Sequence, residues 1–468
     1  MTSTAVVIGG GISGLVTAFD LGRAGWDVTI HEAAARWGGR IFSSPVGDRP
    51  VDAGPDAFLA RVEHGHQLCV DLGIDHLLTS PSAPVPAYVY TDGRLNELPE
   101  GTMFGVPTDL DVLKGSALIS PAGIERAAAD LDLPWEAMSG DPSADTSVGA
   151  VCRERLGDEV TDRLIDPLIG AINASDIDRL SLRAAAPQLA QALAEHGSLI
   201  KGMAAVRERA GRAGAAIGTR DPDRPVFYGL PGGTATIVDR LVEELEEASA
   251  DLRLGSPVDQ ASFAPVTDGA DAVILAVPAF VAARLLGPDG DAAAVLGRTE
   301  YADVTQVVAE LPVTAIERVL DASGILFPRV DGRLMTACTW LSTKWAHYHR
   351  DESALVRLSS GRFGDTRHHD LDDGELVAAL LAELSEAVEV TGDPVAVRVG
   401  RWNHAFPLYP PGHRLRVAEA RAAAAELDPR VHLIGASYDG IGVPACIAAG
   451  RGTARSLLHG GDARSMAG

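Results

Sequence analysis

Six residues near the start of the chain have the types and spacing of a phosphate-binding loop. The segment Gly9-Gly10-Gly11-Ile12-Ser13-Gly14 satisfies G-x-G-x-x-G, and the acidic residue Glu32 follows 23 positions after Gly9. In such loops the first glycine permits a tight turn, the second lets the backbone approach a pyrophosphate, and the third lets helix and strand pack closely. The next helix offers free N–H groups to phosphate, and the acidic residue binds ribose hydroxyls. The pattern therefore predicts a dinucleotide site.

A second glycine-rich stretch indicates which dinucleotide is bound. It reads Arg36-Trp37-Gly38-Gly39-Arg40 and directly follows the segment that ends in Glu32. In flavin enzymes that resemble amine oxidases, an R-x-G-G-R stretch wraps the diphosphate and the ribityl chain. Arg40 would supply a cation on the flavin side; a surface salt bridge is the alternative for this residue. The resemblance favours FAD over NAD.

The elements around these loops predict a parallel sheet flanked by helices. Apolar runs bounded by turn residues indicate buried strands, and apolar residues at helical spacing indicate an amphipathic helix. We expect one sheet to be assembled from distant segments: strands at 5–8, 28–31, 272–277 and 431–434, with helices at 12–24 and 444–458.

The rest of the chain divides by composition. Residues 110–220 are rich in Ala, Leu, Arg and Glu and indicate helices, whereas strand-like runs between 295 and 400 indicate a second sheet, interrupted by a helix at 370–390. We predict an α/β protein with three parts. These are a Rossmann-like FAD-binding domain (1–80, 225–295 and 425–468), a substrate-binding domain with a mixed sheet (81–109 and 296–424) and a mainly helical domain (110–224).

Bulk composition excludes several classes of protein. The chain has 468 residues and a net charge of -24, so it repels nucleic acid and anionic lipid. Its four cysteines are far apart and form no metal or disulfide pattern. No apolar run is long enough to span a membrane, and the first residues enter a strand rather than a signal peptide. We expect a cytoplasmic protein, with peripheral contact at a membrane through residues 103–107 as an alternative to packing of that segment on a neighbouring helix.

Four later stretches narrow the family. They are LNELPEGTMFGVP at 95–107, DPLIGAINASDIDRLSLRAAAPQL at 166–189, FYGLPGGTATIVDRL at 227–241 and GASYDGIGVPACIAAG at 435–450. Over essentially the whole chain the sequence resembles the FAD-dependent porphyrinogen oxidases of haem synthesis, which act on protoporphyrinogen or coproporphyrinogen. The segments 180–183 and 435–443 are the most diagnostic, because the N-terminal flavin loop is shared with amine oxidases and phytoene desaturases.

The resemblance implies a set of FAD contacts. Val258 would meet the adenine through its backbone and Trp402 would lie near the flavin, with plain core packing as the alternative for both. The helix N-terminus after Gly442 would stabilise negative charge on the reduced ring. The full set is Gly9, Gly10, Gly11, Ile12, Ser13, Gly14, Glu32, Ala33, Arg40, Gly54, Pro55, Asp56, Ala57, Val258, Trp402, Ala436, Ile441, Gly442 and Val443.

The flavin carries the chemistry, so we expect no catalytic triad and no metal. Asp56 is the candidate catalytic residue: it follows the Gly54-Pro55 turn, and its carboxylate would orient a pyrrole N–H and accept its proton. A turn-capping role is the alternative. Three pairs of histidines lack a third ligand at useful spacing, and we interpret them as surface residues: His64 and His66, His347 and His349, and His368 and His369.

The expected reaction is oxygen-dependent oxidation of coproporphyrinogen III to coproporphyrin III with release of peroxide. Several protoporphyrinogen-specific relatives place an arginine before the Tyr-Val-Tyr strand, where this chain has Ala87. This departure favours the Gram-positive type, although protoporphyrinogen IX oxidase, amine oxidase, desaturase and non-catalytic porphyrin-binding flavoprotein stay open. A ferrochelatase would collect the product. Four cations are candidates for a basic mouth that grips the substrate carboxylates: Arg61, Arg94, Arg333 and Lys344.

Overall fold

A five-stranded parallel sheet forms one side of the molecule. The computed structural model describes residues 2–82, 86–135, 144–216, 225–287, 289–318 and 321–465. Strands lie in the order β11-β2-β1-β12-β18, and every neighbouring pair is parallel. The segments expected at 5–8, 28–31, 272–277 and 431–434 thus pair in one sheet. The strands are β1 (Thr4–Ile8), β2 (Asp27–His31), β11 (Asp251–Arg253), β12 (Ala272–Leu275) and β18 (Val431–Leu433).

Helices cover both faces of this sheet, because its strands are apolar on both faces. Ala5 and Val7 of β1 pack against one group of helices, whereas Val6 and Ile8 pack against the other. The first group is α1 (Ile12–Arg23), α2 (Glu63–Asp71), α11 (Ala235–Glu247) and α18 (Val443–Ser465). The second is α12 (Gln260–Thr267), α13 (Ala279–Leu285), α14 (Asp291–Leu296) and α17 (His413–Leu427).

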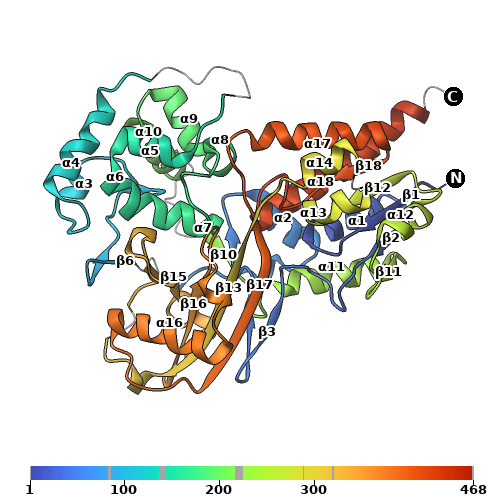
Figure 1. The fold of residues 1–468 in the computed structure, drawn as a ribbon. Helices are drawn as coiled ribbons and strands as arrows, with labels where there is room; N and C mark the ends of the chain where they lie inside the picture. The colour runs from blue at the N-terminus through green and yellow to red at the C-terminus, as the bar shows by residue number, and fades with distance from the viewer. Residues whose placement is uncertain are drawn as a thin grey trace.

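A seven-stranded mixed sheet forms the second layer, in the order β17-β13-β16-β15-β14-β6-β7. Only β14 and β6 pair in parallel. Helix α16 (Asp373–Val388) packs on one face, and the long strands β13 and β17 form the edge of this sheet that is nearer to the five-stranded one (Figure 1). The strands are β6 (Ala87–Thr91), β7 (Arg94–Glu97), β13 (Tyr301–Pro312), β14 (Gly324–Leu326), β15 (Met335–Trp340), β16 (Ser353–Ser360) and β17 (Ala396–Pro407).

A helical region with its own core lies opposite the five-stranded sheet (Figure 1). Its central element is a π-helix, η3 (Thr161–Gly170), which contains Pro167. Proline cannot donate a backbone hydrogen bond inside a helix, and π-helical turns are rare and frequent at functional sites. The α-helices are α3 (Asp111–Lys114), α4 (Pro121–Ala128), α5 (Val148–Leu156), α6 (Asp158–Val160), α7 (Ala171–Asn173), α8 (Leu182–Ala185), α9 (Pro187–His196) and α10 (Leu199–Ala216).

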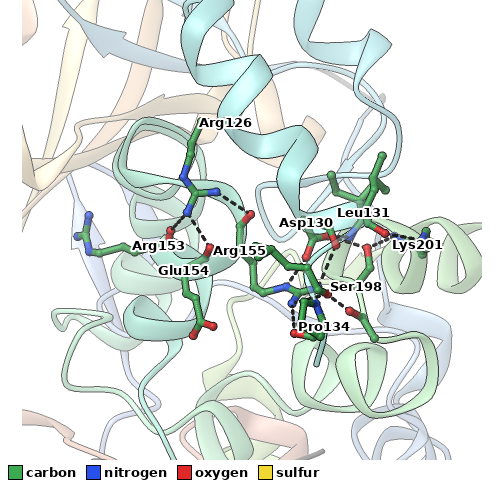
Figure 2. Close-up of polar contacts among 12 residues, drawn as sticks. Arg126, Asp130, Leu131, Pro134, Arg153, Glu154, Arg155, Ser198 and Lys201 are labelled. Atoms are coloured by element: carbon green, nitrogen blue, oxygen red, sulfur yellow. Dashed lines mark hydrogen bonds and ion pairs between the residues drawn. The ribbon is translucent and has the colours of Figure 1, made fainter. Parts of the chain in front are cut away.

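A buried ion pair ties the helices of this region together (Figure 2). Arg155 at the end of α5 and Asp130 are both fully buried, and Arg155 Nε lies 2.6 Å from Asp130 Oδ1. The second oxygen of Asp130 accepts from Ser198 Oγ at 2.6 Å and from the Ile200 N–H at 2.9 Å. Arg155 also donates to the carbonyl oxygens of Pro134, Leu133 and Gly197. Because every polar group of the pair has a partner, the network fixes α5, the helix that leads into η3.

Short elements complete the fold. The segment 103–107 packs on the core of the helical region through Met103, Phe104 and Val106, in agreement with the packing alternative. The two-stranded sheets and remaining helices are β3 (Ser43–Val46), β4 (Arg49–Asp52), β5 (Phe58–Leu59), β8 (Thr102–Met103), β9 (Val106–Pro107), β10 (Phe227–Tyr228), α15 (Leu341–Lys344), η1 (Asp75–Leu77), η2 (Ala129–Leu131), η4 (Val313–Ala315), η5 (Arg329–Asp331), η6 (Ala346–Tyr348) and η7 (Arg367–His369).

The architecture confirms the α/β class with two separate sheets and a helical insert. Most expected element bounds agree to within a few residues; α18 extends past residue 458 to Ser465. The division of the chain into three domains stays a prediction. Within the described residues, no helix combines the length and apolarity needed to cross a membrane.

Candidate active site

The glycine loop between β1 and α1 leaves open space on one side. Gly9 adopts φ +109°, and a Cβ there would lie 2.4 Å from the Ala276 carbonyl oxygen. A Cβ on Gly14 would lie 2.1 Å from the Gly9 carbonyl oxygen, so α1 and β1 pack too closely for a side chain. Apart from Gly11 itself and its two chain neighbours, no described atom lies within 4 Å of the Cβ position of Gly11, the residue that precedes α1. A phosphate can therefore approach the N–H groups of the first helical turn.

Glu32 lies beside this loop, at the end of β2. Its carboxylate accepts hydrogen bonds from the backbone N–H of Gly10 at 2.7 Å and of Ala34 at 2.8 Å. The Glu32 carbonyl oxygen accepts from the Ser256 N–H at 2.9 Å, which brings the segment of Val258 alongside. Val258 is half-buried and packs on the core behind the sheet. The two segments thus form one edge of the loop, where the adenosine end of a dinucleotide would bind.

The Arg36–Arg40 stretch packs directly on the glycine loop. The Gly38 N–H donates to the Gly10 carbonyl oxygen at 2.8 Å. Arg40 donates from Nη2 to the His404 carbonyl oxygen on β17, and burial lowers the pKa of Arg40. A Cβ on Gly54 would lie 2.0 Å from the Arg40 carbonyl oxygen, so the Gly54–Ala57 turn packs directly against the backbone of Arg40. The Arg36–Arg40 stretch therefore contacts both of the other two predicted cofactor segments.

Asp56 is held in a buried ion-pair cluster. Its carboxylate accepts from Lys344 Nζ and Trp345 Nε1, both at 2.9 Å, and from Arg357 Nη1 at 3.0 Å. Burial alone would raise the pKa of Asp56, but the cations of Lys344 and Arg357 lower it well below its usual range. A carboxylate stabilised in this way is a weak base. Of the two roles considered for Asp56, these contacts favour the structural one, an anchor between the turn and the second sheet.

The C-terminal segment closes the loop from the other side. A Cβ on Gly435 would lie 3.7 Å from Ser13 Oγ, and one on Gly450 would lie 2.7 Å from the Ser13 carbonyl oxygen. The Ala436 carbonyl oxygen accepts a hydrogen bond from Tyr409 Oη. Helix α18 begins at Val443, so its N-terminus follows Gly442 as expected. The segments 9–14, 36–40, 54–57 and 435–443 meet around the start of α1, and their close glycine-lined approach fits a flavin dinucleotide.

A polar recess lies where η3 meets the seven-stranded sheet. Four of its lining residues have a buried polar atom with no partner among the described residues: Asp166 Oδ1, Ser175 Oγ, Gln306 Oε1 and Arg362 Nε. Unpartnered buried polar atoms are costly, and several around one hollow indicate a polar ligand. The other lining residues are Pro167, Gly170, Ala171, Ala174, Val304, Phe327, Thr336, Ser359, Gly361 and Phe406.

The recess adjoins the cofactor segments through Trp402. Trp402 Nε1 donates to the Ala53 carbonyl oxygen at 2.9 Å, immediately before the Gly54 turn. The same ring packs in a cluster with Ala174 and Val304, which line the recess. Trp402 therefore lies between the polar recess and the turn at which we expect the flavin.

Asp166 has the electrostatics of a proton acceptor. Its pKa is raised to about 6, mainly by burial and also by the charge of Asp176, against the lowering effects of Arg329 and Arg362. A base whose pKa lies near the working pH is best suited to proton transfer. Sequence reasoning quoted the segment that begins at Asp166 but gave this residue no role. The signal available was an Asp-Pro step inside an apolar helical run, which is unfavourable unless the site requires it.

The cations expected to bind the substrate carboxylates do not line the polar recess. The polar recess is lined by Arg362, and its described lining includes none of the four cations proposed for a basic mouth. Arg333 is paired with Glu386 and Lys344 with Asp56, which leaves both poor candidates for substrate carboxylates.

The interpretation of the histidine pairs as surface residues is wrong for His368. Its side chain is only 1% exposed, and burial lowers its pKa. His369 lies 3.0 Å from Asp303 Oδ2, and His347 is half-buried against Tyr348. His66 and His347 are thus half-buried, whereas His64, His349 and His369 are exposed, as expected of surface residues.

Sequence comparison identifies relatives over nearly the full chain. Residues 12–458 match the family of flavin containing amine oxidoreductases. The chain is 32% identical over 469 residues to the coproporphyrinogen III oxidase of Bacillus subtilis, covering 97% of both chains. It is 35% identical over 459 residues to that of Mycobacterium leprae, covering 95% of this chain and 96% of the relative. Protoporphyrinogen oxidase 2 of Arabidopsis thaliana is 26% identical over 438 residues, covering 86% of this chain and 84% of the relative.

Solved structures share the fold. A protein of Exiguobacterium sp. 255-15, provisionally named protoporphyrinogen oxidase, superposes with a TM-score of 0.82 and 26% identity, over 98% of this chain and 99% of that one. Cyclohexylamine oxidase of Brevibacterium oxydans gives a TM-score of 0.64 at 19% identity, over 98% of this chain and 100% of that one. The second likeness concerns the fold alone.

Proposed function

This chain belongs to the family of flavin-containing amine oxidoreductases, and from that premise we propose that it oxidises coproporphyrinogen III to coproporphyrin III, with FAD as cofactor and molecular oxygen as electron acceptor. The observation that carries the substrate class is the near full-length likeness, at 30–35% identity, to proteins named coproporphyrinogen III oxidase. The plant protoporphyrinogen oxidase is less similar and covers less of the chain.

The cofactor would be held by the segments that meet around α1. The glycine loop and the helix N-terminus would bind the pyrophosphate, Glu32 the ribose, and the Arg40 and Gly54–Ala57 backbones the flavin end. Bound FAD would supply the hydride acceptor and pass the electrons to oxygen, giving peroxide. The proposed contacts are Gly9 to Gly14, Glu32, Ala33, Arg40, Gly54 to Ala57, Val258, Trp402, Ala436 and Ile441 to Val443.

The chain itself would bind and orient the porphyrinogen. The reaction needs three two-electron steps, each of which removes a hydride from a meso carbon and a proton from a pyrrole nitrogen. Positioning the meso carbon and excluding water are therefore the main tasks of the protein. Trp402 contacts both the Gly54 turn and the wall of the polar recess, which supports a substrate site between the sheet and the helical region. A ferrochelatase that collects the product and a cytoplasmic location, with or without peripheral membrane contact, belong to the same proposal.

The test compares two substrates on the purified, yellow protein. Porphyrin fluorescence and peroxide are followed in air with coproporphyrinogen III and protoporphyrinogen IX, and a flavin-free sample corrects for spontaneous oxidation. We expect a clear preference for the first substrate. Preference for protoporphyrinogen IX would replace the substrate, whereas turnover of an amine alone would indicate an amine oxidase. Bound FAD with no peroxide from any substrate would indicate a binding protein.

A further inference from the structure

We propose that Asp166 is a catalytic residue that accepts hydrogen bonds from the pyrrole N–H groups of the porphyrinogen and takes up the proton lost in each oxidation step. This inference rests on the proposed function and deepens it, because it assigns the proton acceptor to the polar recess. The recess encloses about 80 Å³, so it receives the N–H groups rather than the whole macrocycle. The macrocycle would lie across its opening.

The hydrogen bonds of Asp166 leave one oxygen for a ligand. The carboxyl accepts from the Ile177 N–H, whereas Oδ1 is buried and has no partner among the described residues. A cap for the Ile177 N–H requires only one oxygen, so a structural role accounts for half of the carboxyl. An acceptor that is left buried and unpaired destabilises the folded protein. The free oxygen therefore indicates a donor that binds there.

The backbone around Asp166 is also shaped for a site. Asp166 lies in the π-helix η3, directly before Pro167. Ala174, on the wall of the recess, adopts a left-handed conformation with φ 46°, and its carbonyl oxygen accepts from the Phe363 N–H at 2.7 Å. This hydrogen bond joins the helical region to the turn after β16 that carries Arg362. Rare backbone geometry concentrated around one hollow is typical of functional sites.

A porphyrinogen has the complementary chemistry. Its sp³ meso carbons let the pyrroles tilt, so several N–H donors can converge on one anion, which a flat porphyrin does not allow. A carboxylate accepting two or three such bonds is a strong, charge-assisted acceptor. The unpartnered Nε of Arg362 supplies a cation across the same recess, and Arg329, itself paired with Asp176 at 2.6 Å, adds a second positive charge nearby. These charges favour the ionised, proton-accepting form of Asp166.

The proposed step balances. The N–H bond breaks, its electron pair stays in the macrocycle as a C=N bond forms, and the proton moves to Oδ1 of Asp166. The hydride of the meso carbon leaves with the C–H electron pair to the oxidant that the proposed function supplies. Because the pKa of Asp166 is raised by burial to about 6, the carboxyl can release its proton to solvent before the next step.

The decisive experiment compares the flavin-loaded wild type with Asp166→Asn and Asp166→Glu. Asparagine keeps the volume and can still accept from the Ile177 N–H, but it cannot take a proton. We expect kcat to fall by roughly 100-fold or more, the scale of general-base catalysis, while KM changes by less than about threefold. The kcat of the wild type should decline below about pH 6, and this decline should be absent in Asp166→Asn and restored in Asp166→Glu. The rate at which substrate bleaches the flavin without oxygen should fall by a similar factor. This measurement isolates the oxidation of the substrate from the later reaction of the flavin with oxygen.

Asp20→Asn is the matched control. Burial also raises the pKa of Asp20, but this residue lies at the far end of α1, and we expect wild-type kcat and the same decline at low pH. A kcat of Asp166→Asn within threefold of wild type, or an unchanged decline at low pH, would overturn the assignment. If the asparagine variant loses its flavin, Asp166→Glu decides: an activity whose pH dependence matches wild type supports the assignment, and one without the decline refutes it. An inactive wild type would remove the proposed function and the inference together.

Discussion

Replacing Asp166 by asparagine should raise the free energy of unfolding above about pH 6 and should leave it nearly unchanged below about pH 4. Burial raises the pKa of this carboxyl from 3.8 to about 6 in the folded protein. The folded state therefore binds more protons than the unfolded state between these values, so stability falls as pH rises through that window. The full cost of the ionised carboxylate is present above about pH 6 and disappears below about pH 4.

The size of the effect follows from the shift. A difference of about two pKa units corresponds to about 3 kcal/mol. With an unfolding entropy of about 2.1 cal/mol/K per residue, a change of roughly 1 kcal/mol in the free energy of unfolding shifts the melting temperature of a 468-residue chain by about 1 °C. The melting temperature of the variant should therefore be about 3 °C above that of wild type at pH 8. Larger shifts are expected if the helical region melts separately, because fewer residues then share the change.

Calorimetry of the flavin-loaded protein between pH 4 and pH 8 measures this difference directly. The melting temperature of Asp166→Asn minus that of wild type should grow with pH and level off above about pH 7. Asp132→Asn, an exposed substitution in the same region, should give a small difference at every pH. A constant difference for Asp166→Asn, or a loss of stability that increases with pH, would show that the ionised carboxylate is well solvated or fully paired, and the reasoning on the polar recess would fail.

Three further predictions concern the cofactor loop, the helical network and Asp56. Gly14→Ala should abolish visible flavin absorbance, because its Cβ would meet a carbonyl oxygen at 2.1 Å, whereas Gly452→Ala in α18, with open space around it, should keep full flavin content. Arg155→Met should lower the free energy of unfolding by about 3–5 kcal/mol in urea titration, because it leaves Asp130 charged and buried. Asp56→Asn should reduce flavin retention and thermal stability, yet leave the decline of kcat at low pH in place; loss of that decline would return the proton-acceptor role to Asp56.

The parts of the site that adjacent residues build could be predicted from the sequence. The loop from Gly9 to Gly14, its helix and Glu32 follow one another in a local pattern whose spacing dictates the geometry. The distant strands β12 and β18 were also identified, because fully buried parallel strands are short apolar runs. The second sheet followed from the same kind of signal.

The partners of single side chains could not be predicted in this way. Asp56 contacts Lys344 and Arg357, which are 288 and 301 residues away along the chain, and no local sequence pattern records those contacts. The polar recess depends on a π-helix and on a left-handed alanine, which tertiary packing stabilises against intrinsic preference. The sequence pattern therefore does not distinguish Asp166 from any other residue of a helix, although its chemistry differs from that of its neighbours.

Because α18 closes the glycine loop, the order of protein synthesis determines when the cofactor can bind. The backbone of Gly450 lies against Ser13, so this wall of the cofactor site is synthesised more than 400 residues after the phosphate loop. A nascent chain carries the phosphate loop early, but it cannot enclose a flavin cofactor until α18 has emerged and docked. Cofactor binding should therefore follow synthesis of α18, and a shortage of flavin should leave the cofactor site open and the polypeptide exposed to proteases.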